Sequence, residues 1–240
     1  MGRDGAGGGC MSKGEGVQRM FDAIASRYDL MNRVMTLGQD QRWRRVVVAR
    51  AAAPESGAIL DLATGTGDIA ALFAATRPGA VVVGGDFSQK MLEQARRRFS
   101  ALPISWHACD ANALPFAADT FTAVTFGYLL RNVDDTGRVL GEVHRVLRPG
   151  GRVVCLDTTP PGNHPLTPLV RLYLRFGIPL LGRLLADDKA AYAYLTGSTM
   201  AFHDAETLAG YFRAAGFTKV GYRKFMFGTI AIHWGEKGPA

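Results

Sequence analysis

Two glycines and two carboxylates stand at spacings that suit a nucleotide site. Asp61 ends a short apolar run, Gly65 and Gly67 follow it, and a helical pattern begins directly afterwards. A strand, a glycine turn and a helix N-terminus present backbone N–H groups to a ligand, which can lie against a backbone without Cβ atoms. Asp86 ends the next apolar run, 19 positions after Gly67, where a carboxylate can accept hydrogen bonds from two ribose hydroxyls.

The residue Asp61 decides which nucleotide this pattern favours. Gly65-x-Gly67-x-x-Ala70 fits a loose dinucleotide fingerprint, which would indicate a nicotinamide dehydrogenase. A carboxylate facing the turn would repel a pyrophosphate, but it would suit the ammonium and sulfonium groups of S-adenosyl-L-methionine. A glycine turn without a ligand is the structural alternative. The sequence therefore favours adenosylmethionine as the cofactor.

Composition predicts one compact domain. The 240 residues are 48% hydrophobic, enough for a sizeable core. Residues 1–16 contain seven glycines and are expected to form a disordered tail, with a second tail at 238–240 and a single domain at 17–237. The cysteines and histidines are scattered, and no signal-peptide pattern opens the chain. We expect a cytoplasmic protein without a metal site.

Alternating segments predict an α/β fold. Strands are expected at 58–62, 80–85, 104–107, 121–126, 152–157, 218–226 and 228–234. Helices are expected at 17–35 and 40–53, which form an N-terminal cap over 17–53, and at 68–76, 88–99, 135–147 and 204–215, with a turn at Arg148-Pro149-Gly150-Gly151. This order implies a doubly wound, mostly parallel seven-stranded sheet, whose last two strands form a hairpin and make at least one strand antiparallel.

A helical insertion at 160–200 interrupts the alternation. Within it, residues 166–185 carry an apolar stripe at helical spacing, and arginines and prolines in the stripe exclude a membrane span. A lid over a lipophilic substrate, an interface in a homodimer and a helix on a membrane surface would each explain the stripe. We favour a lid that also contacts the membrane, so that the protein is peripheral there.

Six segments carry more specific signatures. They are Tyr28-Asp29-x-Met31-Asn32, Asp61-Leu62-Ala63-x-Gly65-Thr66-Gly67-Asp68, Ala113-Leu114-Pro115-Phe116, Leu130-Arg131-Asn132-Val133, Tyr192-x-Tyr194-Leu195 and Ala231-Ile232-His233-x-Gly235. Over about residues 17–237 the chain resembles the UbiE/COQ5/MenG family of class I adenosylmethionine-dependent methyltransferases. The resemblance implies a Rossmann-like fold and C-methylation of a prenylated hydroquinone precursor, of the demethylmenaquinol type, in menaquinone or ubiquinone synthesis.

The resemblance also implies that Thr66, Asp86, Asp110, Ala111 and Gly127 contact the cofactor. Asp110, which ends the third strand, could accept a hydrogen bond from the adenine amino group or could merely cap a turn. The full predicted cofactor site is Tyr28, Asp61, Ala63, Gly65, Thr66, Gly67, Asp86, Phe87, Asp110, Ala111 and Gly127.

Arg131, Asn132 and Tyr194 are the predicted catalytic residues. Methyl transfer is an in-line displacement by an electron-rich carbon. Because a guanidinium stays protonated, Arg131 would stabilise a phenolate and would not act as a direct base. Its alternative is a surface ion pair with Asp134 or Asp135.

The other candidates for proton chemistry are weaker. Asn132 could orient a hydroxyl or a water, or could cap the following helix. Weaker candidates for handling protons are Tyr128, Asp157 and His203, whereas His144 and His233 are expected to be structural.

Two departures from the family pattern bear on the acceptor. The family usually has Ser-Phe-Gly where this chain has Gly127-Tyr128-Leu129, and His-Arg where it has Asp40-Gln41. The first departure lies where the fourth strand would meet the acceptor. A methyltransferase of another phenol or polyketide-like molecule therefore stays open, as does a non-catalytic sensor.

The net charge of +7 is concentrated in arginines before residue 51 and in Arg96–Arg98. Solvated helix faces, an anionic membrane surface and nucleic acid would all suit it. An amino-group methyltransferase of nucleic acid or protein would show Asn/Asp-Pro-Pro-Tyr/Phe after the fourth strand, where this chain has Phe126-Gly127-Tyr128-Leu129. We expect no nucleic-acid partner.

Overall fold

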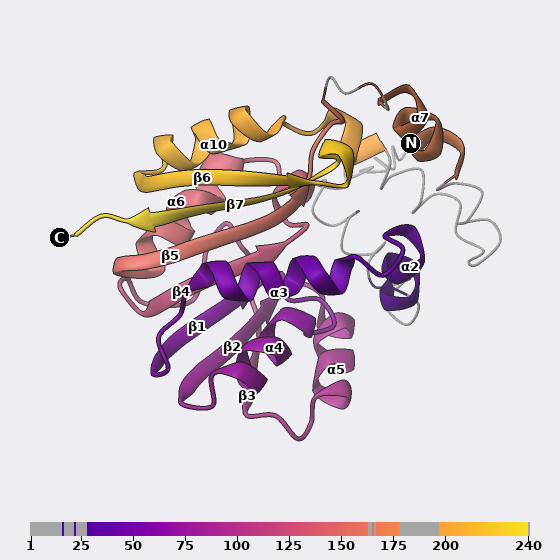
Figure 1. Cartoon of the computed structure of the whole chain (residues 1–240). Helices are drawn as coiled ribbons and strands as arrows, with labels where there is room; N and C mark the ends of the chain where they lie inside the picture. Colours follow the sequence, from indigo (N-terminus) through magenta and orange to yellow (C-terminus); the bar gives the residue numbers. More distant parts are fainter. Residues whose placement is uncertain are drawn as a thin grey trace, which may run out of the picture.

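The computed structural model describes residues 16, 22, 28–162, 165, 167–177 and 197–239. Seven strands form one sheet in the order β3-β2-β1-β4-β5-β7-β6 (Figure 1). They are β1 (Gly57–Leu62), β2 (Ala80–Asp86), β3 (Ile104–Ala108), β4 (Phe121–Gly127), β5 (Leu147–Thr158), β6 (Phe217–Phe225) and β7 (Ile230–Lys237). Strands β1 to β5 pair in parallel, and β7 runs antiparallel to both β5 and β6. The predicted sheet and its closing hairpin are confirmed.

Helices cover both faces of the sheet. They are α2 (Tyr28–Met35), α3 (Asp40–Ala51), α4 (Asp68–Thr76), α5 (Gln89–Arg98), α6 (Thr136–Val146), α7 (Thr167–Leu172) and α10 (Ala205–Ala214). A π-helical turn η2 (Tyr173–Gly177) continues α7, and two 3-10 turns are η1 (Leu130–Asn132) and η3 (Met226–Gly228). Of the predicted 17–35 helix the structure describes Asp22 and residues 28–35. Of the 160–200 insertion it describes residues 160–162, 165, 167–177 and 197–200.

Alternation along the strands produces two hydrophobic cores. Leu60 and Val124 belong to the cluster that packs on α6 and α10, whereas their neighbours Ile59 and Ala123 belong to the cluster that packs on α3 and α4. Successive side chains of a strand point to opposite faces, and parallel strands buried on both faces are apolar on both. The core therefore lies on each side of a fully covered central sheet.

The predicted turn at 148–151 was wrong, because these residues begin the long strand β5. Leu147 pairs with Phe121 and Arg152 pairs with Ala123, so the residues between them bulge out opposite a single residue of β4. Gly150 accordingly has a φ of 76°. A bulge tolerates the missing N–H of proline and the positive φ of glycine, which is why a turn signal occurs inside a strand.

The parallel strands point to the end of the molecule at which α2 and α7 lie (Figure 1). Ligands of open α/β sheets bind outside the carboxyl ends of the strands. In the part of the chain that the structure describes, no helix is long and apolar enough to span a bilayer.

Candidate active site

The turn between β1 and α4 has the shape of a ligand cradle. Ala63, Gly65 and Gly67 have φ values of 50°, 57° and 89°. A Cβ on Gly65 would meet nothing within 4 Å, whereas one on Gly67 would lie 2.6 Å from the Trp106 ring. Gly67 is therefore required by packing, and Gly65 leaves open space above the backbone.

Two arginines hold this turn from outside. Arg98 donates through Nη1 to the carbonyl of Thr66 at 3.0 Å and through Nη2 to Asp68 Oδ1 at 2.8 Å. Arg44 donates to Asp68 and, at 2.9 Å, to Asp40. Because Arg44 is 7% exposed and Asp40 1% exposed, removing one partner would leave an uncompensated buried charge. Arg98 thus has an internal role, although its sequence context resembles a solvated basic face.

Asp61 lies beneath the turn, as predicted, and its oxygens are engaged there. The carboxylate accepts from Thr64 Oγ1 at 2.6 Å and from Thr125 Oγ1 at 2.9 Å, and the backbone N–H of Ala70 also donates to it. Burial raises the pKa of Asp61 to about 7, although these hydrogen bonds act to lower it. A cationic ligand group nearby would favour the charged form and lower this pKa again.

Asp86 connects the end of β2 to the glycine turn. Its Oδ2 accepts from the Gly65 N–H at 2.7 Å, and its Oδ1 accepts from the Ser88 N–H at 2.8 Å. Burial raises the pKa of Asp86, and the nearby Asp22 acts in the same direction; the Ser88 hydroxyl also donates to Asp22. The backbone N–H of Phe87 also donates to this carboxylate, so one of its roughly four lone-pair sites stays open for a ribose hydroxyl.

Four further predicted cofactor residues lie on other elements of the fold. Asp110 Oδ1 accepts from the backbone and side-chain nitrogens of Asn112 at 2.8 and 2.9 Å, so the turn-capping alternative holds for this oxygen. Phe87 is 48% exposed after β2, and Gly127 ends β4. The backbone of Tyr28 lies in α2.

A second cluster lies at the ends of β4 and β5. Arg131 is 9% exposed, donates through Nη1 to Thr158 Oγ1 at 3.2 Å, and places its guanidinium 5.0 Å from the centre of the Tyr128 ring. Its Nε is 3.9 Å from Asp157 Oδ1, and within the described chain this buried nitrogen has no hydrogen-bond partner. The alternative of a surface ion pair with Asp134 or Asp135 was wrong, because η1 turns Arg131 inward.

Asp157 is the buried counter-charge of Arg131. Its Oδ1 accepts from the Thr158 N–H at 2.8 Å and its Oδ2 from the Arg131 N–H at 3.4 Å. Burial raises the pKa of Asp157 to about 6, although Arg131 acts to lower it. Asp157 was among the weaker candidates for proton chemistry, because no sequence pattern indicates that the ends of β4 and β5 lie side by side.

Asn132 does not cap the following helix. The carboxylate of Asp135 accepts from the Arg138 N–H at 2.9 Å and caps α6 instead. The Asn132 amide donates at 2.7 Å to the carbonyl of Tyr128, a residue held at a φ of 60°. Asn132 therefore supports a strained backbone beside Arg131. The third predicted catalytic residue, Tyr194, lies outside the described residues.

The histidines pack among aromatic rings. His233 is 1% exposed, with Nε2 2.8 Å from the carbonyl oxygen of Ala205, and burial lowers its pKa to about 4. The ring of His144 lies 5.1 Å from the Phe217 ring, so both histidines pack against neighbouring residues. His203 contacts the rings of Phe202 and Tyr211, at 5.1 and 4.8 Å.

Comparison with known proteins identifies the family. Residues 10–237 match the sequence model of the ubiE/COQ5 methyltransferase family. The chain belongs to this family. It is 67% identical to the ubiquinone/menaquinone biosynthesis C-methyltransferase UbiE of Desulfotalea psychrophila, over 95% of this chain and 92% of that one. It is 44% identical to the demethylmenaquinone methyltransferase of Thermus thermophilus, over 91% and 100% of the two chains.

A solved structure shares the fold. Phosphoethanolamine N-methyltransferase 2 of Haemonchus contortus, in complex with S-adenosyl-L-methionine, has a TM-score of 0.70 at 15% identity, over 96% of this chain and 61% of that one. In this family member, the open space at Gly65 and the carboxylates of Asp86 and Asp61 are the features on which the predicted adenosylmethionine site depends.

Replacing Asp86 tests the ribose site. Asp86→Ala should weaken adenosylmethionine binding by about 1–3 kcal/mol, because the ribose hydroxyls lose their acceptor. Calorimetry measures the change, with the exposed Asp119, which binds Lys237, replaced by alanine as the control. Undiminished affinity in a folded Asp86→Ala variant would show that Asp86 does not hold the ribose.

Proposed function

We propose that this chain methylates a ring carbon of a prenylated hydroquinone precursor, of the demethylmenaquinol type, with S-adenosyl-L-methionine as the methyl donor. The family and the named relatives support the reaction class. The observation that carries the assignment of the site is Arg131 Nε, a buried donor that has no hydrogen-bond partner among the described residues and lies just after β4, the strand that pairs with β1. A buried unsatisfied donor is costly, and it is expected where a ligand supplies the acceptor.

The chemistry requires an electron-rich carbon. When bound, adenosylmethionine supplies an electrophilic methyl group on its sulfonium. Loss of the proton from a hydroxyl beside the reacting carbon, to water, would delocalise phenolate charge onto that carbon. The carbon would take the methyl group, S-adenosylhomocysteine would be the leaving group, and the ring proton would pass to water to restore the aromatic ring. Arg131 would stabilise the phenolate, because a permanently charged donor in a site of low dielectric acts most strongly on developing charge.

Asp157 would be a positioning residue in this scheme. Its carboxylate accepts backbone N–H groups on both sides of the cluster and faces the Arg131 guanidinium. An ionised Asp157 would therefore fix the direction in which Arg131 donates. Burial raises the pKa of Asp157 to about 6, so its ionisation falls within the range of an enzyme assay.

A second candidate function rests on Tyr128. The Gly127-Tyr128-Leu129 segment departs from the usual family pattern, and the structure places the Tyr128 ring under Arg131. A changed residue at this point favours a changed acceptor, so another phenolic or polyketide-like substrate is the alternative. Association with an anionic membrane surface and formation of a homodimer remain predictions from the sequence.

Substitutions of Arg131 test the phenolate role. Arg131→Lys keeps the charge and loses the planar fork, and Arg131→Ala loses both. Both variants should lower kcat, alanine more strongly, with nearly unchanged adenosylmethionine affinity, because the interaction forms only in the transition state. Arg97→Ala, at an exposed position of α5, is the matched control. An alanine variant with wild-type turnover would assign Arg131 a structural role.

The pH dependence of turnover tests Asp157. Ionised Asp157 holds Arg131, so kcat of the wild type should fall as the pH decreases through about 6, where the carboxyl takes up a proton. Asp157→Asn should have a lower kcat at pH 8 and should lack this acidic limb. Asp134→Asn should keep the limb. If Asp157→Asn keeps it as well, the titrating group is another one, with Asp61 the next to test.

The oxidation state of the acceptor tests the reaction itself. An oxidised quinone ring is electron-poor, so methyl incorporation from labelled adenosylmethionine should require dithionite and be small in air. A demethylmenaquinol with its isoprenoid tail is the first substrate to test. Equal incorporation into the oxidised quinone would refute the mechanism. Activity only on an unprenylated phenol would favour the second candidate function.

A further inference from the structure

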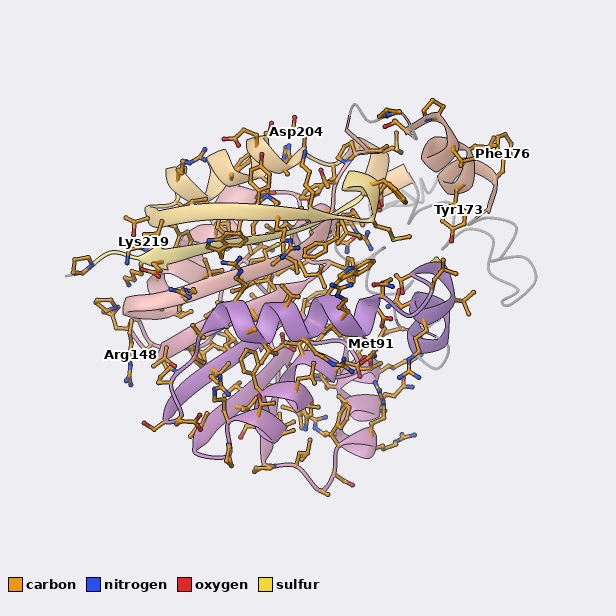
Figure 2. All side chains as sticks on the ribbon, viewed as in Figure 1. Met91, Arg148, Tyr173, Phe176, Asp204 and Lys219 are labelled. Atoms are coloured by element: carbon orange, nitrogen blue, oxygen red, sulfur yellow. The ribbon has the colours of Figure 1, made fainter. Side chains whose placement is uncertain are left out.

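An apolar cavity of about 520 Å³ lies between the insertion and the β6–β7 hairpin. Its lining residues are Leu169, Leu172, Tyr173, Phe176 and Gly177 on one side and Met226, Phe227 and Thr229 on the other. Figure 2 shows Tyr173 and Phe176 at the same end of the molecule as the tips of the parallel strands. The volume lies within the range of about 300–1,000 Å³ that small-molecule sites occupy, and none of the described lining residues carries a charge.

The rim of the cavity exposes large hydrophobic side chains. Leu169, Leu172, Phe176 and Phe227 are 64%, 54%, 59% and 55% exposed. They make up half of the eight large hydrophobic side chains that are exposed in the described part of the chain. Single exposed apolar residues are ordinary, but a contiguous group around an apolar cavity indicates a binding surface.

The hairpin wall of the cavity is strained. Met226 and Phe227 have φ values of 50° and 54°, and Gly228 follows with 88°. The Thr229 N–H donates to the carbonyl of Met226 at 3.2 Å and closes the turn around Phe227. At this position of a hairpin turn Asn, Asp and Gly are favoured, and a bulky side chain costs stability. Strained residues of this kind concentrate at ligand sites.

The wall of the cavity is hydrogen-bonded to β5, whose end contacts Arg131. The carbonyl of Thr229 accepts from the Thr159 N–H at 2.9 Å, and Ile230 pairs with Thr158. The Thr158 hydroxyl in turn accepts from Arg131 at 3.2 Å. A continuous series of hydrogen bonds therefore joins the wall of the apolar cavity to Arg131, which would donate to the acceptor ring.

We propose that this cavity binds the isoprenoid tail of the methyl acceptor, with the strained Met226–Phe227 turn as one wall. The inference rests on the proposed function, because the acceptor ring must lie at Arg131 for its tail to reach the cavity. A substrate with an uncharged chain on a polar ring would place the chain in the apolar cavity and the ring at Arg131. A bilayer or a second copy of the chain would cover the rim without requiring an aromatic side chain in a strained turn.

The variant Phe227→Asn tests the proposal. Asparagine accepts the left-handed conformation, so the turn should persist and the melting temperature should not fall. The KM for a prenylated hydroquinone should rise about tenfold or more, as expected for the loss of one buried aromatic contact, while the KM for its tail-less analogue stays unchanged. Lys219→Asn is the control, because Lys219 also has a positive φ, 49°, and lies at the far end of β6 (Figure 2).

A second variant, Leu172→Gln, removes apolar surface from the opposite wall and should show the same dependence on the tail. Equal KM changes for tailed and tail-less acceptors, or no change for either, would overturn the proposal. A variant that loses only vesicle binding would make the rim a bilayer contact, and one that loses only self-association would make it an interface between copies. Both results also overturn it.

Direct binding separates this inference from the proposed function. Equilibrium dialysis with a prenylated and an unprenylated hydroquinone measures the tail contribution without any methyl transfer. Tail-dependent binding that Phe227→Asn abolishes would support the cavity even if no methylation occurred, in which case the proposed function alone would fail. Methylation with binding that does not depend on the tail would leave the proposed function standing and overturn the cavity assignment.

Discussion

The hydrogen bond from the Gly65 N–H to Asp86 joins the glycine turn after β1 to the end of β2. It is possible only because β1 and β2 pair in parallel, with Leu62 opposite Gly85, so that both strands end at the same edge. This hydrogen bond fixes the turn. The left-handed residues of the turn lie above Asp61 and lead into α4. Arg98 and Arg44 then fix the other side of the turn through Asp68. The geometry of the predicted cofactor site therefore depends first on the register of the sheet and only then on the chemistry of its side chains.

The sequence was sufficient for the sheet and for the glycine turn, because both depend on local patterns. Apolar runs bounded by glycine and acidic residues marked β1 and β2, and the short link between the last two strands marked the hairpin. Contacts between distant segments were not accessible in this way. Arg131 pairs with Asp157, 26 positions away, and the nearer Asp134 and Asp135 were the natural candidates without knowledge of which strands adjoin. The left-handed Phe227 was equally hidden, since its residue type opposes the conformation it adopts.

The features that reduce the stability of the folded state lie at one end of the fold. Burial raises the pKa of Asp61 to about 7 and that of Asp157 to about 6, so each folded carboxyl holds its proton more tightly than an unfolded one. The contribution of these two groups to the stability of the folded state is therefore largest at low pH. It is lost as the pH rises through their folded pKa values and the carboxyls ionise. Tyr128 and Phe227 add left-handed backbone near the same strand ends. Features of this kind persist where function selects for them.

The sheet divides the chemistry between its two halves. The β1–β2–β3 half carries the glycine turn, Asp86 and Asp110, while the β4–β5–β7–β6 half carries Arg131, Asp157 and the apolar cavity. The halves meet where β1 pairs with β4, and Thr125 of β4 donates to Asp61 of β1 across that boundary. The departure from the family pattern at Gly127-Tyr128-Leu129 lies only on the half that carries the proposed acceptor site. A change of acceptor can therefore arise there without altering the hydrogen bonds that shape the cofactor turn.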